Sequence, residues 1–95
     1  MPQLLPTGTT QADSTDITLA SGVSTVISLF AASGVSIPLE PQALIQRKGS
    51  NGIYRTLSGA TGILSGSWLE IVIGGPGTFR VRKLASAVAV GVDRD

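Results

Sequence analysis

A run of small residues followed by strict alternation is the feature that most constrains this chain. After Gly74–Gly77, the side chains of Phe79 and Val81 alternate with those of Arg80 and Arg82. A period of two is the side-chain period of a β-strand, in which successive residues point to opposite faces. The segment therefore predicts a strand with one apolar and one basic face, entered from a turn.

The glycine run also raises the alternative of a phosphate-binding loop. Such a loop needs several converging backbone N–H groups and commonly leads into a helix. Here Pro76 removes one N–H group, and the residues that follow have the period of a strand. We therefore interpret the run as a turn.

The turn joins this strand to the segment 68–73, and the length of the loop decides which side chains lie opposite one another. A four-residue loop would place apolar residues opposite arginines, whereas a five-residue loop separates an apolar from a polar face. We therefore predict a hairpin with a five-residue loop. The predicted pairs are Ile71 with Phe79, Leu69 with Val81, Glu70 with Arg80, and Trp68 with Arg82.

The clearest predicted hairpin surrounds Gly49-Ser50-Asn51-Gly52, because Asn and Gly tolerate the positive φ of tight turns. A two-residue turn at the Asn-Gly step would place Lys48 opposite Arg55, and like charges directly opposite one another are unfavourable. A four-residue loop avoids this pair and lets Arg47 lie on the Tyr54 ring. We predict the four-residue loop.

Composition agrees with an all-β fold. The chain of 95 residues is rich in Val, Ile, Thr, Ser and Gly, contains no cysteine or histidine, and has short segments bounded by turn residues. We expect a small β-sandwich or barrel-like domain of about six to eight strands. The predicted core consists of Ile17, Leu19, Val23, Ile27, Leu29, Leu44, Leu57, Leu69, Ile71, Phe79, Val81 and Val90.

The first fifteen residues show no periodicity and contain Pro2 and Pro6. We expect residues 1–15 to form an extended N-terminal arm and residues 16–95 to form a single β domain. Leu4 and Leu5 would give the arm apolar side chains with which to contact a partner. Residues 58–67, rich in Gly and Ser, are expected to form a loop anchored by Ile63 and Leu64.

Catalysis and cofactor binding find little support in the residue types. Without Cys or His, the usual zinc, haem and iron–sulfur sites are excluded, and few nucleophiles or general bases remain. The six acidic residues are scattered, with no spacing that indicates a carboxylate pair or a calcium loop. We expect no enzyme, no metal and no cofactor.

The basic residues indicate either a solvated sheet face with local ion pairs or a contact surface for another protein. Arginine, tryptophan and tyrosine are enriched at binding hot spots. The net charge of +1 and the aromatic content of 4% disfavour a nucleic-acid surface. The candidate partner-binding residues are Leu4, Leu5, Arg47, Tyr54, Arg55, Trp68, Arg80 and Arg82.

Four segments in order resemble small β-rich bacteriophage virion proteins of the capsid decoration (cement) type. They are SGVSTVISLF, IQRKGSNGIYRTL, GPGTFRVRK and VGVD, within about residues 16–93. The resemblance implies a structural protein of the virion, assembled in the host cytoplasm, that binds the outer capsid lattice and stabilises the head. Its expected partners are the major capsid protein or another virion protein, and a homo-oligomer, with a trimer favoured.

Two alternatives remain open at this point. One is a phage tail or fibre component, or a module that recognises a host surface, which exposed Trp68 and Tyr54 in one concave patch would favour. A nucleic-acid-binding β-barrel is the third candidate.

Neither a signal peptide nor a membrane-spanning segment is expected. The first residues carry neither a charged segment nor an apolar stretch of adequate length. The longest nearly apolar run, Leu84–Val92, is much shorter than a membrane helix needs.

Overall fold

The computed structural model describes residues 3–57, 62–86 and 88–95. Over these residues the chain forms β-strands and no helix. The strands are β1 (Gln3–Gly8), β2 (Ala12–Asp13), β3 (Ile17–Leu19), β4 (Ser24–Ala31), β5 (Ala43–Lys48), β6 (Tyr54–Thr56), β7 (Ile63–Leu64), β8 (Glu70–Gly74), β9 (Gly77–Lys83) and β10 (Val90–Arg94). The all-β prediction is confirmed. Several of the strands are only two or three residues long.

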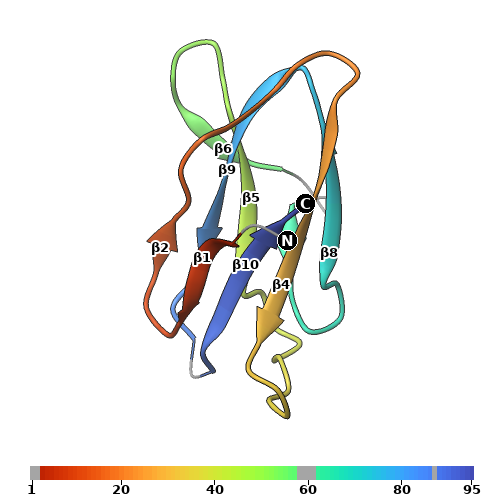
Figure 1. Ribbon diagram of the computed structural model, residues 1–95. Coiled ribbons are helices and arrows are strands. Elements are labelled where there is room, and N and C mark those ends of the chain that lie inside the picture. The colour runs from red at the N-terminus through yellow and green to blue at the C-terminus, as the bar shows by residue number, and fades with distance from the viewer. Residues whose placement is uncertain (1–2, 58–61, 87) are drawn as a thin grey trace.

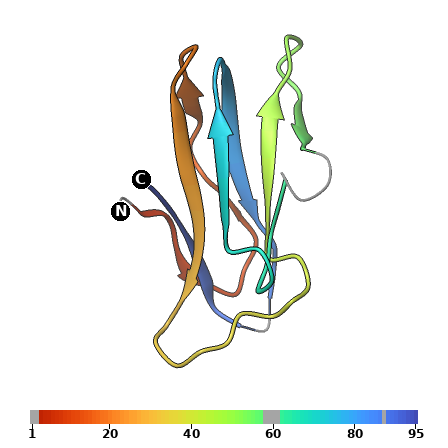
Figure 2. The same cartoon turned by 90° about the vertical axis from the view of Figure 1, so that its right-hand side faces the viewer.

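Two antiparallel sheets form a β-sandwich. The four-stranded sheet has the order β1-β10-β4-β8. The six-stranded sheet has the order β2-β9-β5-β6, with β3 also on β9 and β7 also on β5. Figure 2 shows β4 (orange) and β5 (yellow-green) on opposite sides of the molecule, joined by a long connection at one end.

The core lies between the two sheets and follows the alternation of the sequence. Both sheets supply buried side chains, among them Ile27 of β4, Ile45 of β5 and Val81 of β9. The predicted core is right at Ile17, Leu19, Ile27, Leu29, Ile71, Phe79, Val81 and Val90, which are all buried. Val23 and Leu69 are instead exposed, and Leu44 and Leu57 are half-buried.

The predicted hairpin between residues 68–73 and 78–83 is wrong. Strand β8 pairs with β4 and strand β9 pairs with β5, so the chain crosses from one sheet to the other at Gly74–Gly77 (Figure 1). The apolar sides of both strands still point inward, because facing across a core sorts apolar from polar side chains as well as pairing does. Gly75 is needed here, since a Cβ would lie 2.2 Å from the carbonyl oxygen of Ala20.

The expected N-terminal arm is not seen, because Gln3–Gly8 and Ala12–Asp13 are strands of the two sheets. Strand β1 pairs with β10 in Figure 1, and Leu5 lies opposite Val92 with only 5% of its surface exposed. Strand β2 pairs with β9. Pro6 is compatible with β1 because β1 is an edge strand, where a missing N–H group breaks no pairing. The sandwich thus includes residues on both sides of the boundary predicted at residue 16.

The hairpin of β5 and β6 forms, with a register that differs by one residue from the prediction. Lys48 lies opposite Tyr54, and Arg47 lies opposite Arg55. The loop therefore has five residues, 49–53, and the backbone N–H of Gly49 donates to the carbonyl of Ile53 at 2.8 Å. The side-chain oxygen of Asn51 accepts a further bond from the Ile53 N–H, which an Asx turn provides.

Of the predicted Gly/Ser-rich loop, residues 58–61 lie outside the described residues. Ile63 and Leu64 form β7, and Leu64 is fully buried, so the predicted anchor is found at Leu64.

Candidate functional site

Strand β5 divides the basic and aromatic candidates into two groups. Its alternation places Arg47 on the same side as the buried Ala43 and Ile45, and places Gln46 and Lys48 on the outer face of the six-stranded sheet. Residues directly opposite one another share a face, so Arg55 lies with Arg47. The outer face therefore differs from the surface that carries Arg47 and Arg55, which lies at the end of the sandwich with the β5–β6 loop and is called the open end below.

The outer face holds an internally paired network. Asp13 of β2 accepts hydrogen bonds from Arg82 at 2.9 and 3.3 Å, and its carboxylate lies 3.7 Å from Arg80. The Arg82 hydrogen bond is the main reason that the pKa of Asp13 lies below its usual value. Arg80 donates to Gln46 at 2.8 Å. Arg80 and Arg82 thus form their ion pairs with a carboxylate of the same chain.

Tyr54 completes this network. The guanidinium carbon of Arg80 lies 3.8 Å from the centroid of the Tyr54 ring, and the Lys48 ammonium lies 5.8 Å from it. The phenol hydroxyl donates to Asp16, and this hydrogen bond raises the pKa of Tyr54. The predicted stack of Arg47 on Tyr54 is replaced by Arg80, because the register places the two residues on opposite faces of the sheet.

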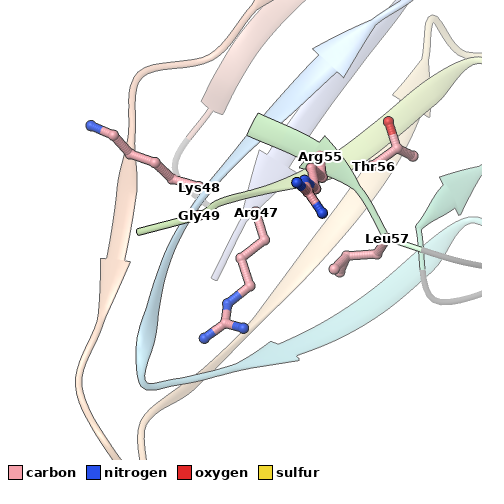
Figure 3. Close-up of a pocket in the computed structure, with 6 residues that line it drawn as sticks. All are labelled: Arg47, Lys48, Gly49, Arg55, Thr56 and Leu57. Carbon is pink, nitrogen blue, oxygen red and sulfur yellow. The ribbon is translucent and has the colours of Figure 1, made fainter. Parts of the chain in front are cut away.

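The open end of the sandwich holds a pocket of about 240 Å³. It is lined by Arg47, Lys48, Gly49, Arg55, Thr56 and Leu57. Figure 3 shows Arg47 extending toward the β8–β9 connection, Arg55 on the neighbouring strand, and the ammonium of Lys48 turned away from both. The β5–β6 loop and the β8–β9 connection lie at the same end of the molecule (Figure 1).

Arg47 is fixed in this pocket by two contacts. It donates to the carbonyl oxygen of Pro76 at 3.1 Å, and its guanidinium carbon lies 5.9 Å from the centroid of the Phe79 ring. Arg55 lies directly opposite, and within residues 3–57, 62–86 and 88–95 neither arginine forms an ion pair. The pocket is therefore positively charged without an internal counter-ion among these residues.

The remaining candidates lie elsewhere. Leu5 is part of the core and Leu4 packs against it, so neither forms a free arm contact. Trp68 is 52% exposed and exchanges backbone hydrogen bonds with Ser65, close to the first residues of β5, whereas Tyr54 lies opposite the last residue of β5. The two aromatic residues therefore do not share one patch.

The sequence reasoning missed the positions of three residues. Leu57, predicted to lie in the core, lines the pocket, and Ile53, in the β5–β6 loop, is 57% exposed. Lys83 is buried, and its ammonium donates to the carbonyls of Pro6 and Val90 at 3.4 Å each. The strand period already placed Lys83 on the side of Phe79 and Val81, which was the signal for its inward position.

Across the described part of the chain, no three acidic side chains lie close enough together to hold a metal ion. Nor does that part contain a helix with the length and hydropathy to span a membrane. Comparisons of the chain with protein-family models, with curated proteins and with solved structures find no match.

Proposed function

We propose that the chain is a structural virion protein of a bacteriophage, of the capsid decoration (cement) type, which binds the outer capsid lattice and stabilises the head. The resemblance of the four sequence segments within about residues 16–93 to such proteins supports this proposal. The structural observation on which it rests is the open end of the sandwich. There Arg47 and Arg55, which form no ion pair within the described residues, line a pocket next to the loop that carries the exposed Ile53. Arginine next to apolar surface is typical of protein–protein hot spots.

The pocket supports docking by surface complementarity because one of its arginines is already ordered. Arg47 is held by Pro76 and Phe79, so binding would restrict few further rotamers of this side chain. The proposed partner is the major capsid protein or another virion protein. The chain would act in the virion, after assembly in the host cytoplasm, without enzymatic activity or a cofactor.

A homo-oligomer, with a trimer favoured, is part of the proposal. Strand β8 is an edge of its sheet, and Val72 on its outer face is 67% exposed. Trp68 and Leu69, which precede β8, are also exposed. Exposed edges with apolar side chains are suited to pairing with another chain. Light scattering on the purified protein measures the oligomer number.

A tail or fibre component that recognises a host surface is the second candidate. The half-exposed Trp68 favours it, since a tryptophan offers a large contact area to a ligand. The separation of Trp68 from Tyr54 weakens it. A nucleic-acid-binding β-barrel has less support, because Arg80 and Arg82 share Asp13 on the outer face.

The experiment that tests the proposal is to locate the protein within the virion. Phage particles are purified from a strain that carries the gene, heads and tails are separated, and each fraction is analysed by quantitative mass spectrometry. The proposal expects the protein in heads, at a copy number comparable with that of the major capsid protein. Recovery in tails at a few copies would favour the second candidate, and absence from particles would contradict both.

A further inference from the structure

We propose that the pocket between Arg47 and Arg55 binds a carboxylate side chain from an acidic segment of the docking partner. This inference rests on the proposed function, for which it names the chemistry of the partner. The occupant is a peptide in which Glu or Asp is flanked by apolar residues.

The position of Arg55 is the first reason. Arg55 lies directly opposite Arg47 on neighbouring strands, and like charges in that position are unfavourable for folding. Elsewhere in the described chain the close arginines Arg80 and Arg82 share Asp13. An anion bound between Arg47 and Arg55 would offset the repulsion of their charges, as Asp13 offsets that of Arg80 and Arg82.

The donors that remain are the second reason. A guanidinium carries five N–H donors, and Arg47 uses one side of the group on Pro76. Arg55 is exposed on β6 and lines the same pocket (Figure 3). Both guanidinium groups line the pocket and keep N–H donors for the oxygens of a carboxylate, and such charge-assisted hydrogen bonds are stronger than neutral ones.

The walls favour a peptide over a nucleic acid. Leu57 lines the pocket and Ile53 is exposed in the adjacent loop, so apolar surface is available near the charge. A phosphate backbone instead needs a long basic surface. Here the neighbouring arginines of the outer face are engaged by Asp13, and the net charge of the chain is only +1.

The test uses a blocked four-residue peptide, acetyl-Leu-Glu-Leu-Glu-amide, titrated into the ¹⁵N-labelled full chain and followed by backbone NMR. The matched variants are Arg55→Gln and Arg94→Gln, which remove the same charge from the two different sheets. We expect changes in backbone chemical shift confined to residues 47–57. The affinity for the peptide should be about tenfold weaker in Arg55→Gln, because one charged hydrogen-bonded pair is lost. The affinity of Arg94→Gln should equal that of the wild-type protein. A thermal melt of Arg55→Gln at or above the wild-type temperature shows that the variant is folded.

Three outcomes would overturn the inference. They are the absence of shifts at about 10 mM peptide, equal affinity of the two variants, and stronger binding of a single-stranded oligonucleotide at the same residues. If the protein is found in heads but the peptide does not bind, the inference fails and the proposed function stands. If the peptide binds and the protein is absent from heads, the site stands and the capsid is not the partner.

Discussion

The guanidinium of Arg80 lies flat enough against Tyr54 to bring its central carbon within 3.8 Å of the ring centroid. The same side chain donates from Nε to Gln46, which is only 7% exposed. The Arg80 guanidinium therefore both donates a hydrogen bond to the buried Gln46 amide and stacks on the Tyr54 ring. Through Asp13 it also connects the edge strand β2 to the middle of the sheet.

Replacing Arg80 by alanine should lower the free energy of unfolding by about 1–3 kcal/mol, because the variant loses a stacked cation and leaves the Gln46 oxygen without its partner. Urea denaturation followed by the fluorescence of the single tryptophan measures the change. The control is Arg55→Ala, which should leave stability unchanged or slightly higher. Equal losses in both variants would contradict the distinction drawn between the two arginines.

The single tyrosine gives a pH-dependent readout of the contact with Asp16. Because the hydrogen bond to Asp16 raises the pKa of Tyr54 above its ordinary value of 10.0, the folded state holds this proton more tightly than the unfolded state. The stabilisation is therefore complete below pH 10 and is lost as pH rises through the higher, folded-state pKa.

Ultraviolet titration of the phenol measures this directly. We expect a midpoint above 10.0 in the folded protein and a return toward 10.0 in Asp16→Asn. A midpoint at or below 10.0 in the wild-type protein would show that the hydroxyl does not donate to Asp16 in solution.

The N-terminal strand should be part of the folded unit. Leu5→Ala should cost about 2–4 kcal/mol of stability, because a core leucine is replaced by a cavity between β1 and the opposite sheet. Leu4→Ala, which truncates the half-buried neighbour, should cost clearly less. Chemical denaturation compares the two variants. If Leu5→Ala unfolds like the wild-type protein, residues 3–8 form a free arm after all.

The crossing between the sheets should depend on Gly75. Gly75→Ala should cost about 1–3 kcal/mol or more, because its Cβ would lie 2.2 Å from a backbone oxygen that cannot move independently. The neighbouring Gly74→Ala is the matched control, since the nearest atom to its Cβ would be 4.0 Å away. Thermal melts of the two variants should separate clearly, and similar melting temperatures would contradict the close approach of the chain at Gly75.

Sequence periodicity predicted which side chains point inward far better than it predicted which strands pair. The alternation of Ile71, Phe79 and Val81 is satisfied by a hairpin and also by two strands that face each other across a core. Both arrangements bury the same atoms. The choice depends on contacts distant in sequence, such as the approach of Gly75 to Ala20, which no local pattern contains.

The candidate site was predicted only in part for a similar reason. A one-residue difference in the β5–β6 loop moves Arg47 from Tyr54 to Arg55 and so creates the charged pocket. The prediction avoided one like-charge pair, Lys48 with Arg55, and the register adopted contains another. Such repulsion costs a few tenths of a kcal/mol to about 1 kcal/mol, and the two hydrogen bonds between Gly49, Asn51 and Ile53 in the loop contribute a comparable stabilisation.

Binding of the purified chain to phage heads tests the central claim most directly. Heads are purified from a phage that lacks the gene and are titrated with labelled wild-type protein, Arg55→Gln or Arg94→Gln, and bound protein is measured after sedimentation. The account predicts saturable binding of the wild-type protein and of Arg94→Gln, with clearly weaker binding of Arg55→Gln. Heads that bind none of the three proteins would contradict the proposed function, and heads that bind all three equally would contradict the role of the pocket.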